Sequence, residues 1–323
     1  MENFRLNENE VKKQRIFFSD NFNISLKDQV FMLSDSVHIL QAGQINISSK
    51  ESLVDIKDAF LYPDMKSKNY NRLSTTFQIS VPTLHLHNIN FEEAYFSKEI
   101  SLEKLEVDAP KFRIFTRSGI AKSLDLNKFQ IPLPPVLNSL ELRELELKNG
   151  QVITYETSGE KQKVKSNFNI DMILPGVSIK TDKNKQVKLS TSNLIAKISR
   201  FETLLGTYHK FSIQQLDFNK KQKTLVVSGL NIEPFAQKNI GNKFAVAAPQ
   251  ITFSGFDVQQ ALDKNFFIFD EITLSNPKIA IEITDSIKGD KLEFTKNLDL
   301  YSFIEPYTDK LEINRLNLNN VDL

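Results

Sequence analysis

Four histidines are the side chains in this sequence best suited to acid–base or metal chemistry. His85 and His87 flank Leu86, so in a strand both imidazoles would project from one face, a spacing that offers two metal ligands. No third ligand lies close by in the sequence, and we expect exposed strand histidines rather than a metal site. His38 and His209 occupy equivalent positions of the repeat described below, which indicates shared architecture rather than catalysis.

The usual signatures of catalysis are missing from the sequence. It contains no GxSxG elbow, no glycine-rich phosphate loop, no HExxH pair and no EF-hand loop. The absence of cysteine excludes disulfide frameworks, thiolate zinc sites and cysteine nucleophiles. The carboxylates alternate with lysine and arginine in the way that a solvated face does. We therefore expect a protein that is not an enzyme and carries no cofactor.

The charge balance bears on possible partners. The 323 residues include 41 basic and 40 acidic side chains, with no basic run of the kind that binds nucleic acid. Nucleic acid is therefore not an expected partner.

The first fifteen residues lack the apolar core of a signal peptide, and no stretch approaches the roughly 18 apolar residues of a membrane span.

The elements that carry these side chains are predicted by an eight-residue pattern, apolar-x-apolar-x-x-apolar-x-apolar, which we call the octamer. We find it ten times, beginning at Leu40, Val54, Leu84, Ile100, Leu140, Phe211, Leu225, Ile251, Phe267 and Leu311. Taken in order, the last five starting positions differ from the first five by 171, 171, 167, 167 and 171 in the numbering. Four pairs of prolines keep nearly the same step: Pro63 and Pro234, Pro82 and Pro249, Pro110 and Pro277, Pro132 and Pro306.

This register predicts two tandem copies of a unit of about 171 residues. The first copy is assigned to residues 1–155, with its core at 16–149. Residues 156–323 hold connecting strands and the second copy, with its core at 187–320. We expect the copies to share one continuous sheet.

Alternation at period two predicts strands with one apolar face. The extra residue in the middle of each octamer would turn the second half over, unless a β-bulge absorbs it by placing two residues opposite one. A tight hairpin at each break is the rival interpretation, but only three of the ten breaks contain glycine, so bulges are favoured. Bulges that line up would bend the sheet into a trough.

The other positions of the octamer predict what each face contacts. Of its forty x positions only three are apolar, Phe60, Val226 and Ile268, so the second face should be wet. Helices that could cover the apolar face are few: we expect short ones near Phe91–Phe96, Phe201–Leu205, Asp257–Leu262 and Leu300–Phe303, acting as caps. The periodicity leaves two architectures open, a closed sandwich and an open groove that holds an apolar ligand.

The order of motifs in the two copies supports the groove. LEVDAPKFRIF from Leu105, LDLNKF and LNSLELRELELKNGQVITYE correspond to ITLSNPKIAIEI from Ile272, LDLYSF and LEINRLNLNNVDL. This order resembles the AsmA-like superfamily of bacterial envelope proteins, the broad group of TamB and YhdP. The resemblance implies a fragment of a lipid-transfer bridge: an elongated, bent antiparallel β-sheet forming an open groove, on the periplasmic side of the cell envelope, with the inner-membrane anchor in segments outside this chain.

The function implied is passive carriage of phospholipid or another apolar lipid between envelope membranes, and so outer-membrane biogenesis. The groove lining that we predict comprises Leu84, Leu86, Ile89, Phe91, Ile100, Leu102, Leu105, Val107, Leu140, Leu142, Leu145, Leu147, Phe211, Ile213, Leu216, Phe218, Ile251, Phe253, Phe256, Val258, Phe267, Phe269, Ile272 and Leu274. The alternative function is that of a scaffold or interaction protein made of two β-sandwiches with closed cores.

Overall fold

The computed structural model describes residues 1, 5, 15–33, 36–117, 139–159, 161–181, 187–205, 209–234, 243–282 and 308–321. Strands make up 71% of the structure and helices 7%, so the protein is all-β, as the alternation of apolar and polar residues predicts. The strands form a large mixed sheet. The chain divides into two compact units, which are described separately: unit 1 is Met1–Thr116, Gln130–Val152 and Ile170–Leu194, and unit 2 is Arg117–Phe129, Ile153–Asn169 and Ile195–Leu323.

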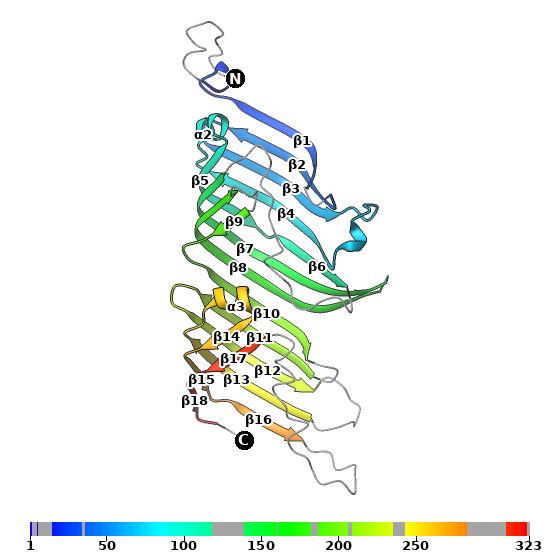
Figure 1. Cartoon of the computed structure of the whole chain (residues 1–323), viewed down its shortest axis with the longest axis vertical. Helices are drawn as coiled ribbons and strands as arrows, with labels where there is room; N and C mark the ends of the chain where they lie inside the picture. Colours follow the sequence, from blue (N-terminus) through cyan, green and yellow to red (C-terminus); the bar gives the residue numbers. More distant parts are fainter. Residues whose placement is uncertain are drawn as a thin grey trace. The chain divides into compact units, whose positions relative to one another are not determined.

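Unit 1 contains the strands of the first half of the chain (Figure 1). These are β1 (Asn23–Met32), β2 (His38–Ser48), β3 (Leu53–Pro63), β4 (Thr75–His87), β5 (Glu99–Asp108), β6 (Lys111–Arg117), β7 (Ser139–Ser158), β8 (Lys161–Thr181) and β9 (Val187–Ser190). The hydrogen-bonded order is β1-β2-β3-β4-β5-β7-β8, while β6 pairs with β4 and β7, and β9 with β8. The long strands β7 and β8 give some of their residues to each unit.

Unit 2 contains the remaining strands of the chain. Its strands are β10 (Ile195–Leu205), β11 (His209–Asn219), β12 (Thr224–Pro234), β13 (Lys243–Ser254), β14 (Phe266–Phe269), β15 (Glu271–Ser275), β16 (Lys278–Glu282), β17 (Lys310–Ile313) and β18 (Leu316–Asn319). The order is β10-β11-β12-β13-β15-β18, with β16 paired to β13 and a separate pair of β14 with β17.

The helices are short. Two 3-10 turns, Ile16–Phe18 and Tyr70–Arg72, accompany α2 (Phe91–Phe96) and α3 (Val258–Lys264). Asn90 caps α2 by accepting from the backbone N–H of Glu93, and Asp257 caps α3 by accepting from those of Gln259 and Gln260. Both α-helices lie where the sequence predicts them.

Two expectations about the helices have other outcomes. Phe201–Leu205 is strand and not helix, because these residues pair with β11 from Leu205↔His209 to Phe201↔Ile213 and this ladder overrides the local preference. The predicted helix at Leu300–Phe303 lies outside the described residues, as do Pro132 and Pro306.

The sheet is mixed, whereas the sequence predicts an antiparallel one. β5 pairs with β7 in parallel, and so do β14 with β17 and β15 with β18. A parallel pair requires a long connection between its strands. The connection from the end of β5 at Asp108 to the start of β7 at Ser139 is long enough, and β6 lies within it.

The extra residue of the octamer lies at the same level in neighbouring strands. In β2 and β3 the pairing runs from His38↔Pro63 to Ala42↔Ala59, skips Gly43 and Asp58, and resumes at Gln44↔Lys57 in unchanged register. The predicted bulge, with two residues opposite one, is therefore wrong. Both strands carry the extra residue at one level, so it needs no unequal pairing.

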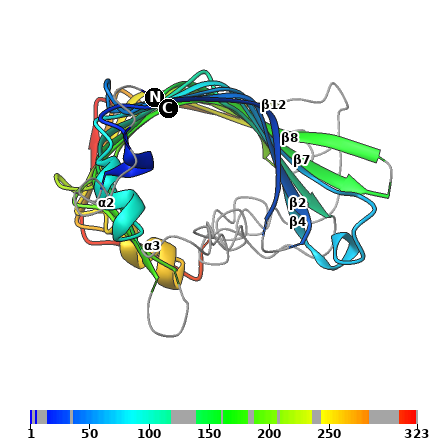
Figure 2. The same ribbon diagram turned by 90° about the horizontal axis from the view of Figure 1, so that it is seen from above.

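These skipped residues form one line across each unit, which we call the first bend line. In unit 1 it follows Asp28, Gly43, Asp58, Pro82, Ala109 and Asn149, and in unit 2 it follows Arg200, Gln214, Gly229, Pro249, Asn276 and Asn320. Eight of the twelve have a positive φ, from 49° at Ala109 to 64° at Gly229. A left-handed residue turns the chain sharply, so the strands bend here, and Figure 2 shows β2 and β4 as bent ribbons.

A second bend line lies further along the strands. It follows Asn88, Glu103 and Arg143 in unit 1, and Gly255, Asp270 and Asn314 in unit 2. It interrupts four predicted octamers: those from Leu84 and Ile251 leave the strand after their first half, while those from Phe267 and Leu311 are divided between two strands. The remaining six lie within single strands.

Candidate functional site

The cross-strand register assembles the apolar octamer positions of unit 1 into continuous rows. One row runs from β1 to β7 through Leu26, Ile45, Ile56, Leu84, Val107 and Leu147, and the next through Ile24, Ile47, Val54, Leu86, Leu105 and Leu145. Residues directly opposite one another on a sheet face contact through their side chains. We call the surface made by apolar octamer positions in either unit the apolar face.

Most of the apolar face is only half-buried. Of the forty apolar octamer positions, 12 are buried, 24 are intermediate and four are exposed. In the lining that the sequence predicts, ten side chains are buried and fourteen are intermediate. A core sealed by a second layer would bury nearly all of them. The described residues therefore bury this face only in part.

One part of the apolar face is packed tightly. In unit 1, Leu102 of β5 and Leu142 of β7 form a buried cluster with Ile89, Val177 and Ile179. Phe91, the first residue of α2, packs against this cluster, and Glu93 of α2 accepts a hydrogen bond from Ser101 of β5. Figure 2 shows α2 on the inner side of the bent strands. The short helix thus covers one margin of the apolar face and not its length.

In unit 2 the packed part of the apolar face is built from phenylalanine. Phe256 lies 5.8 Å from Phe218, 5.9 Å from Phe267 and 5.3 Å from Phe269, measured between ring centroids. Phe253 adds a further contact at 5.0 Å from Phe269. Aromatic pairs at these distances contribute beyond their buried area. The sequence predicts these rings as lining, and the structure brings them together.

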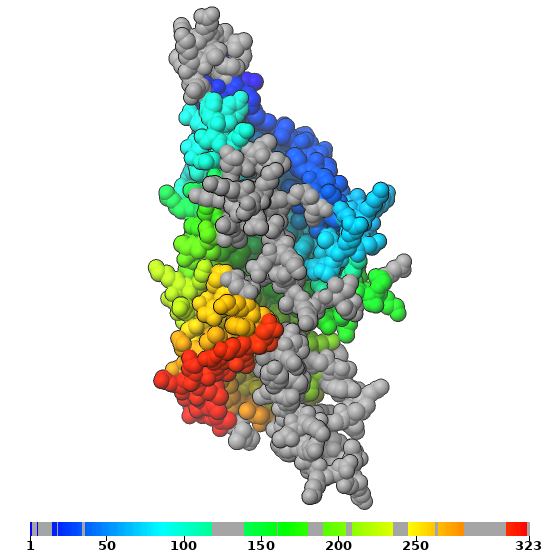
Figure 3. Space-filling view, in the orientation of Figure 1, coloured from blue at the N-terminus to red at the C-terminus, as the bar shows by residue number. Residues whose placement is uncertain are grey.

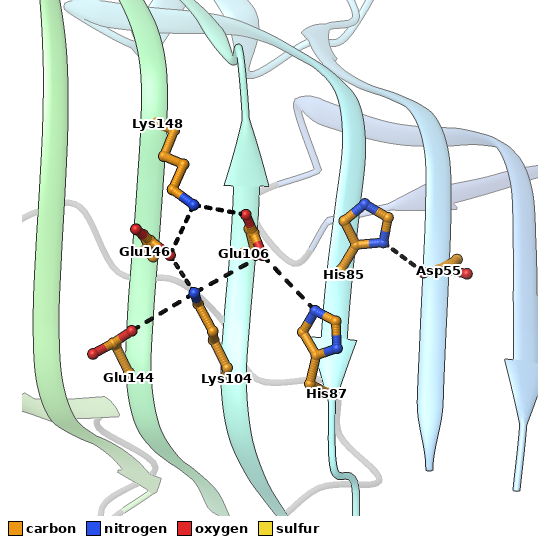
Figure 4. Close-up of polar contacts among 8 residues, drawn as sticks. All are labelled: Asp55, His85, His87, Lys104, Glu106, Glu144, Glu146 and Lys148. Carbon is orange, nitrogen blue, oxygen red and sulfur yellow. Dashed lines mark hydrogen bonds and ion pairs between the residues drawn. The ribbon is translucent and has the colours of Figure 1, made fainter. Parts of the chain in front are cut away.

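The opposite face carries alternating charges that pair across strands (Figure 4). Lys148 of β7 lies 3.0 Å from Glu106 of β5 and 3.2 Å from Glu146. Lys104 of β5 pairs with Glu146 as well, and lies 3.9 Å from Glu144. We call Lys104, Glu106, Glu146 and Lys148 the charge ladder.

The pairing shifts the ionisation of all four ladder residues. Hydrogen bonds from Lys148 to Glu106 and from Lys104 to Glu146 hold the pKa of each carboxyl below its usual range. The same contacts raise the pKa of both lysines. The ladder is thus a set of mutually stabilised charges on a solvated face, and its groups are fully ionised at neutral pH.

His85 and His87 lie on this polar face, as the alternation predicts. His85 Nδ1 is 2.6 Å from Asp55 Oδ1, and His87 Nε2 is 3.9 Å from Glu106 Oε2. Within the part of the chain that the structure describes, no group of three histidine or acidic side chains is arranged to hold a metal ion. His38 is buried at the start of β2, and His209 is buried at the start of β11.

Several residues of the apolar face were missed in the sequence. In β4 the residues that flank the first bend line form an octamer that starts at Ile79 and overlaps the predicted one. Its apolar residues are Ile79, Val81, Leu84 and Leu86. In β13 the corresponding set is Val246, Ala248, Ile251 and Phe253. Both strands carry the octamer pattern at these positions, but it shares residues with the predicted octamers. In β1 the pattern is concealed by Gln29, which takes the place of an apolar residue.

Among the described residues, no helix is both long enough and apolar enough to cross a membrane. Comparison of the chain with protein-family models and with curated proteins finds no match.

Proposed function

We propose that the apolar face binds the acyl chains of a phospholipid or another apolar lipid, and that the two halves of the chain are copies of one unit that form a continuous open groove. In this proposal the protein is a non-enzymatic segment of an AsmA-like lipid-transfer bridge on the periplasmic side of the bacterial envelope. The observation that carries the proposal is the half-buried state of rows of apolar side chains that run unbroken across successive strands.

The energetics of the apolar face favour a lipid ligand. Each methylene that moves from water to an apolar surface contributes roughly 0.8 kcal/mol. Rows such as Leu26 to Leu147 offer similar apolar side chains at every strand. An acyl chain would therefore meet near-equivalent sites along the stack of strands. Binding of this kind holds a lipid without confining it to one position, which is what transfer requires.

The equivalence of the two halves supports the proposed repeat. The starts of β2 and β11 are offset by 171 in the numbering, as are those of β3 and β12, while α2 and α3 are offset by 167. Ala109 and Asn276, each followed by a fully buried proline, both take positive φ at the same place in the sheet. Each unit thus places a positive-φ residue before a buried proline at the same position of its sheet, as two copies of one unit would.

A single-cysteine experiment tests lipid binding, because the natural chain has no cysteine. A photoreactive label at Ile56→Cys lies on the apolar face, and the same label at Lys57→Cys lies on the polar face of the same strand. Illumination of the protein purified from bacterial membranes should link lipid to the label at position 56 and not at 57, as read by mass spectrometry.

The alternative, a scaffold protein with closed cores, predicts a different result. The buried cluster around Leu102 and Leu142 would then extend over the whole apolar face in solution, and neither label would capture lipid. Equal labelling at both positions would also contradict the proposal, since it would indicate adsorption without a preferred face.

A further inference from the structure

The last two strands of unit 2 expose apolar side chains that are covered in unit 1. Leu311, Ile313, Leu316 and Leu318 are 42%, 39%, 55% and 53% exposed. Their counterparts in the first copy are Leu140, Leu142, Leu145 and Leu147, of which Leu142 is 3% and Leu147 is 6% exposed. The residue types are nearly the same, so the difference comes from their surroundings.

The cover in unit 1 is strand β8. β7 lies between β5 and β8 in the sheet, and Leu174, Val177 and Ile179 of β8 pack in the cluster that contains Leu142. In unit 2, β18 pairs with β15 on one side and is the last strand of its sheet among the described residues, while β17 pairs with β14. Figure 3 shows the residues of β17 and β18, in red, on the surface of unit 2.

We infer that the outer edge of β17 and β18 binds an extended polypeptide strand whose apolar residues have the spacing of Leu174, Val177 and Ile179. A sheet edge offers unpaired backbone N–H and C=O groups, which give affinity to an added strand, and side-chain pockets along it give specificity. The β7–β8 interface of the same molecule is the template. This inference does not depend on lipid binding.

The template also limits what the incoming strand can be. A Cβ atom at Gly150 of β7 would lie 2.9 Å from the backbone oxygen of Ile170 and 2.7 Å from Leu147 Cδ2. The counterpart of Gly150 in the second half is Val321. A strand on this edge can therefore follow the path of β8 beside Leu311 to Leu318. Beside Val321 it must take a different path, because the side chain there leaves no room for the close approach that Gly150 allows.

A fluorescent peptide with the sequence of residues 172–181 tests the inference against the full chain. The expected result is saturable binding, measured by fluorescence anisotropy, with new hydrogen-exchange protection of the β17 and β18 amides. Leu318→Asp should weaken binding at least about tenfold, since it places a charge against the apolar side chains of the peptide. Asn319→Asp adds the same charge on the opposite face of β18 and should leave the affinity unchanged.

Two controls decide the remaining outcomes. A peptide with Val177→Asp and Ile179→Asp should not bind, and a peptide lengthened to begin at residue 166 should gain affinity only in the Val321→Gly protein. No binding of the natural peptide, equal binding to the Leu318→Asp protein, or protection confined to β1 would each overturn the inference. The exchange measurement on the natural chain decides the matter even if Leu318→Asp fails to fold.

Discussion

Replacing Leu142 and Ile313, which hold the same octamer position 171 residues apart, by alanine should have very different effects on stability. Leu142 is 3% exposed and packs with Ile89, Leu102, Val177 and Ile179. Its replacement removes three carbon atoms, worth roughly 2.4 kcal/mol of transfer free energy, and leaves a cavity, so the cost should be about 3 to 4 kcal/mol. Ile313 is 39% exposed beside solvent. Its replacement leaves no closed cavity and should cost about 1 kcal/mol.

Hydrogen exchange read by mass spectrometry suits this comparison, because the chain has two compact units and a single global unfolding free energy is not defined for it. Leu142→Ala should accelerate exchange of the slowest amides of β5 and β7, whereas Ile313→Ala should affect only β14 and β17, and weakly. Equal costs at the two positions would refute the reasoning, since they would mean that the edge of unit 2 is covered in solution. The measurement should be repeated at low protein concentration to exclude cover by a second copy.

Further substitutions test the first bend line, the close approach of β7 and β8, and the charge ladder. Asp58→Val should lower the stability of unit 1 by about 1 to 2 kcal/mol, read from hydrogen exchange of the β2 and β3 amides, because a β-branched residue does not tolerate a φ of 53°, while Asp58→Gly should not lower it. Gly150→Ala should cost about 1 to 3 kcal/mol through its clash with Ile170. Glu106 and Glu146 have lowered pKa values, so their stabilisation is present above the usual glutamate pKa and is lost as the pH falls through the folded values. Thermal unfolding at pH 7 and pH 3 should accordingly show a smaller acid loss for Glu146→Gln.

Local patterns in the sequence predict much of the fold. The octamers that begin at Leu40, Val54, Phe211 and Leu225 lie within single strands, and both capped helices lie near their expected positions. The polar face is predicted as well, because alternation assigns His85 and its neighbours to one side of a strand. Each of these features depends on residues that are close together in the sequence.

What the sequence does not reveal depends on pairing between distant residues. In β4 the octamer pattern fits a start at Leu84 as well as a start at Ile79. Only the alignment of Pro82 with Asp58 of β3 shows that the octamer centred on the bend starts at Ile79. The parallel pairing of β5 with β7 has no local signal, since it is set by the route of the chain between them. Phe201 is drawn into a strand by its partners in β11.

The aligned bends offer a physical reason for the partial burial of the apolar face. On a flat sheet, side chains of one face point in parallel and stay exposed unless a second layer covers them. When every strand bends at the same level, side chains on the inner side converge from the two sides of the bend, so residues such as Val81 and Leu84 of β4 shield each other in part. Convergence alone does not complete their burial, since both of these side chains are only half-buried. A flexible apolar ligand would supply the missing contacts, and this is why we favour a lipid over a rigid partner for this face.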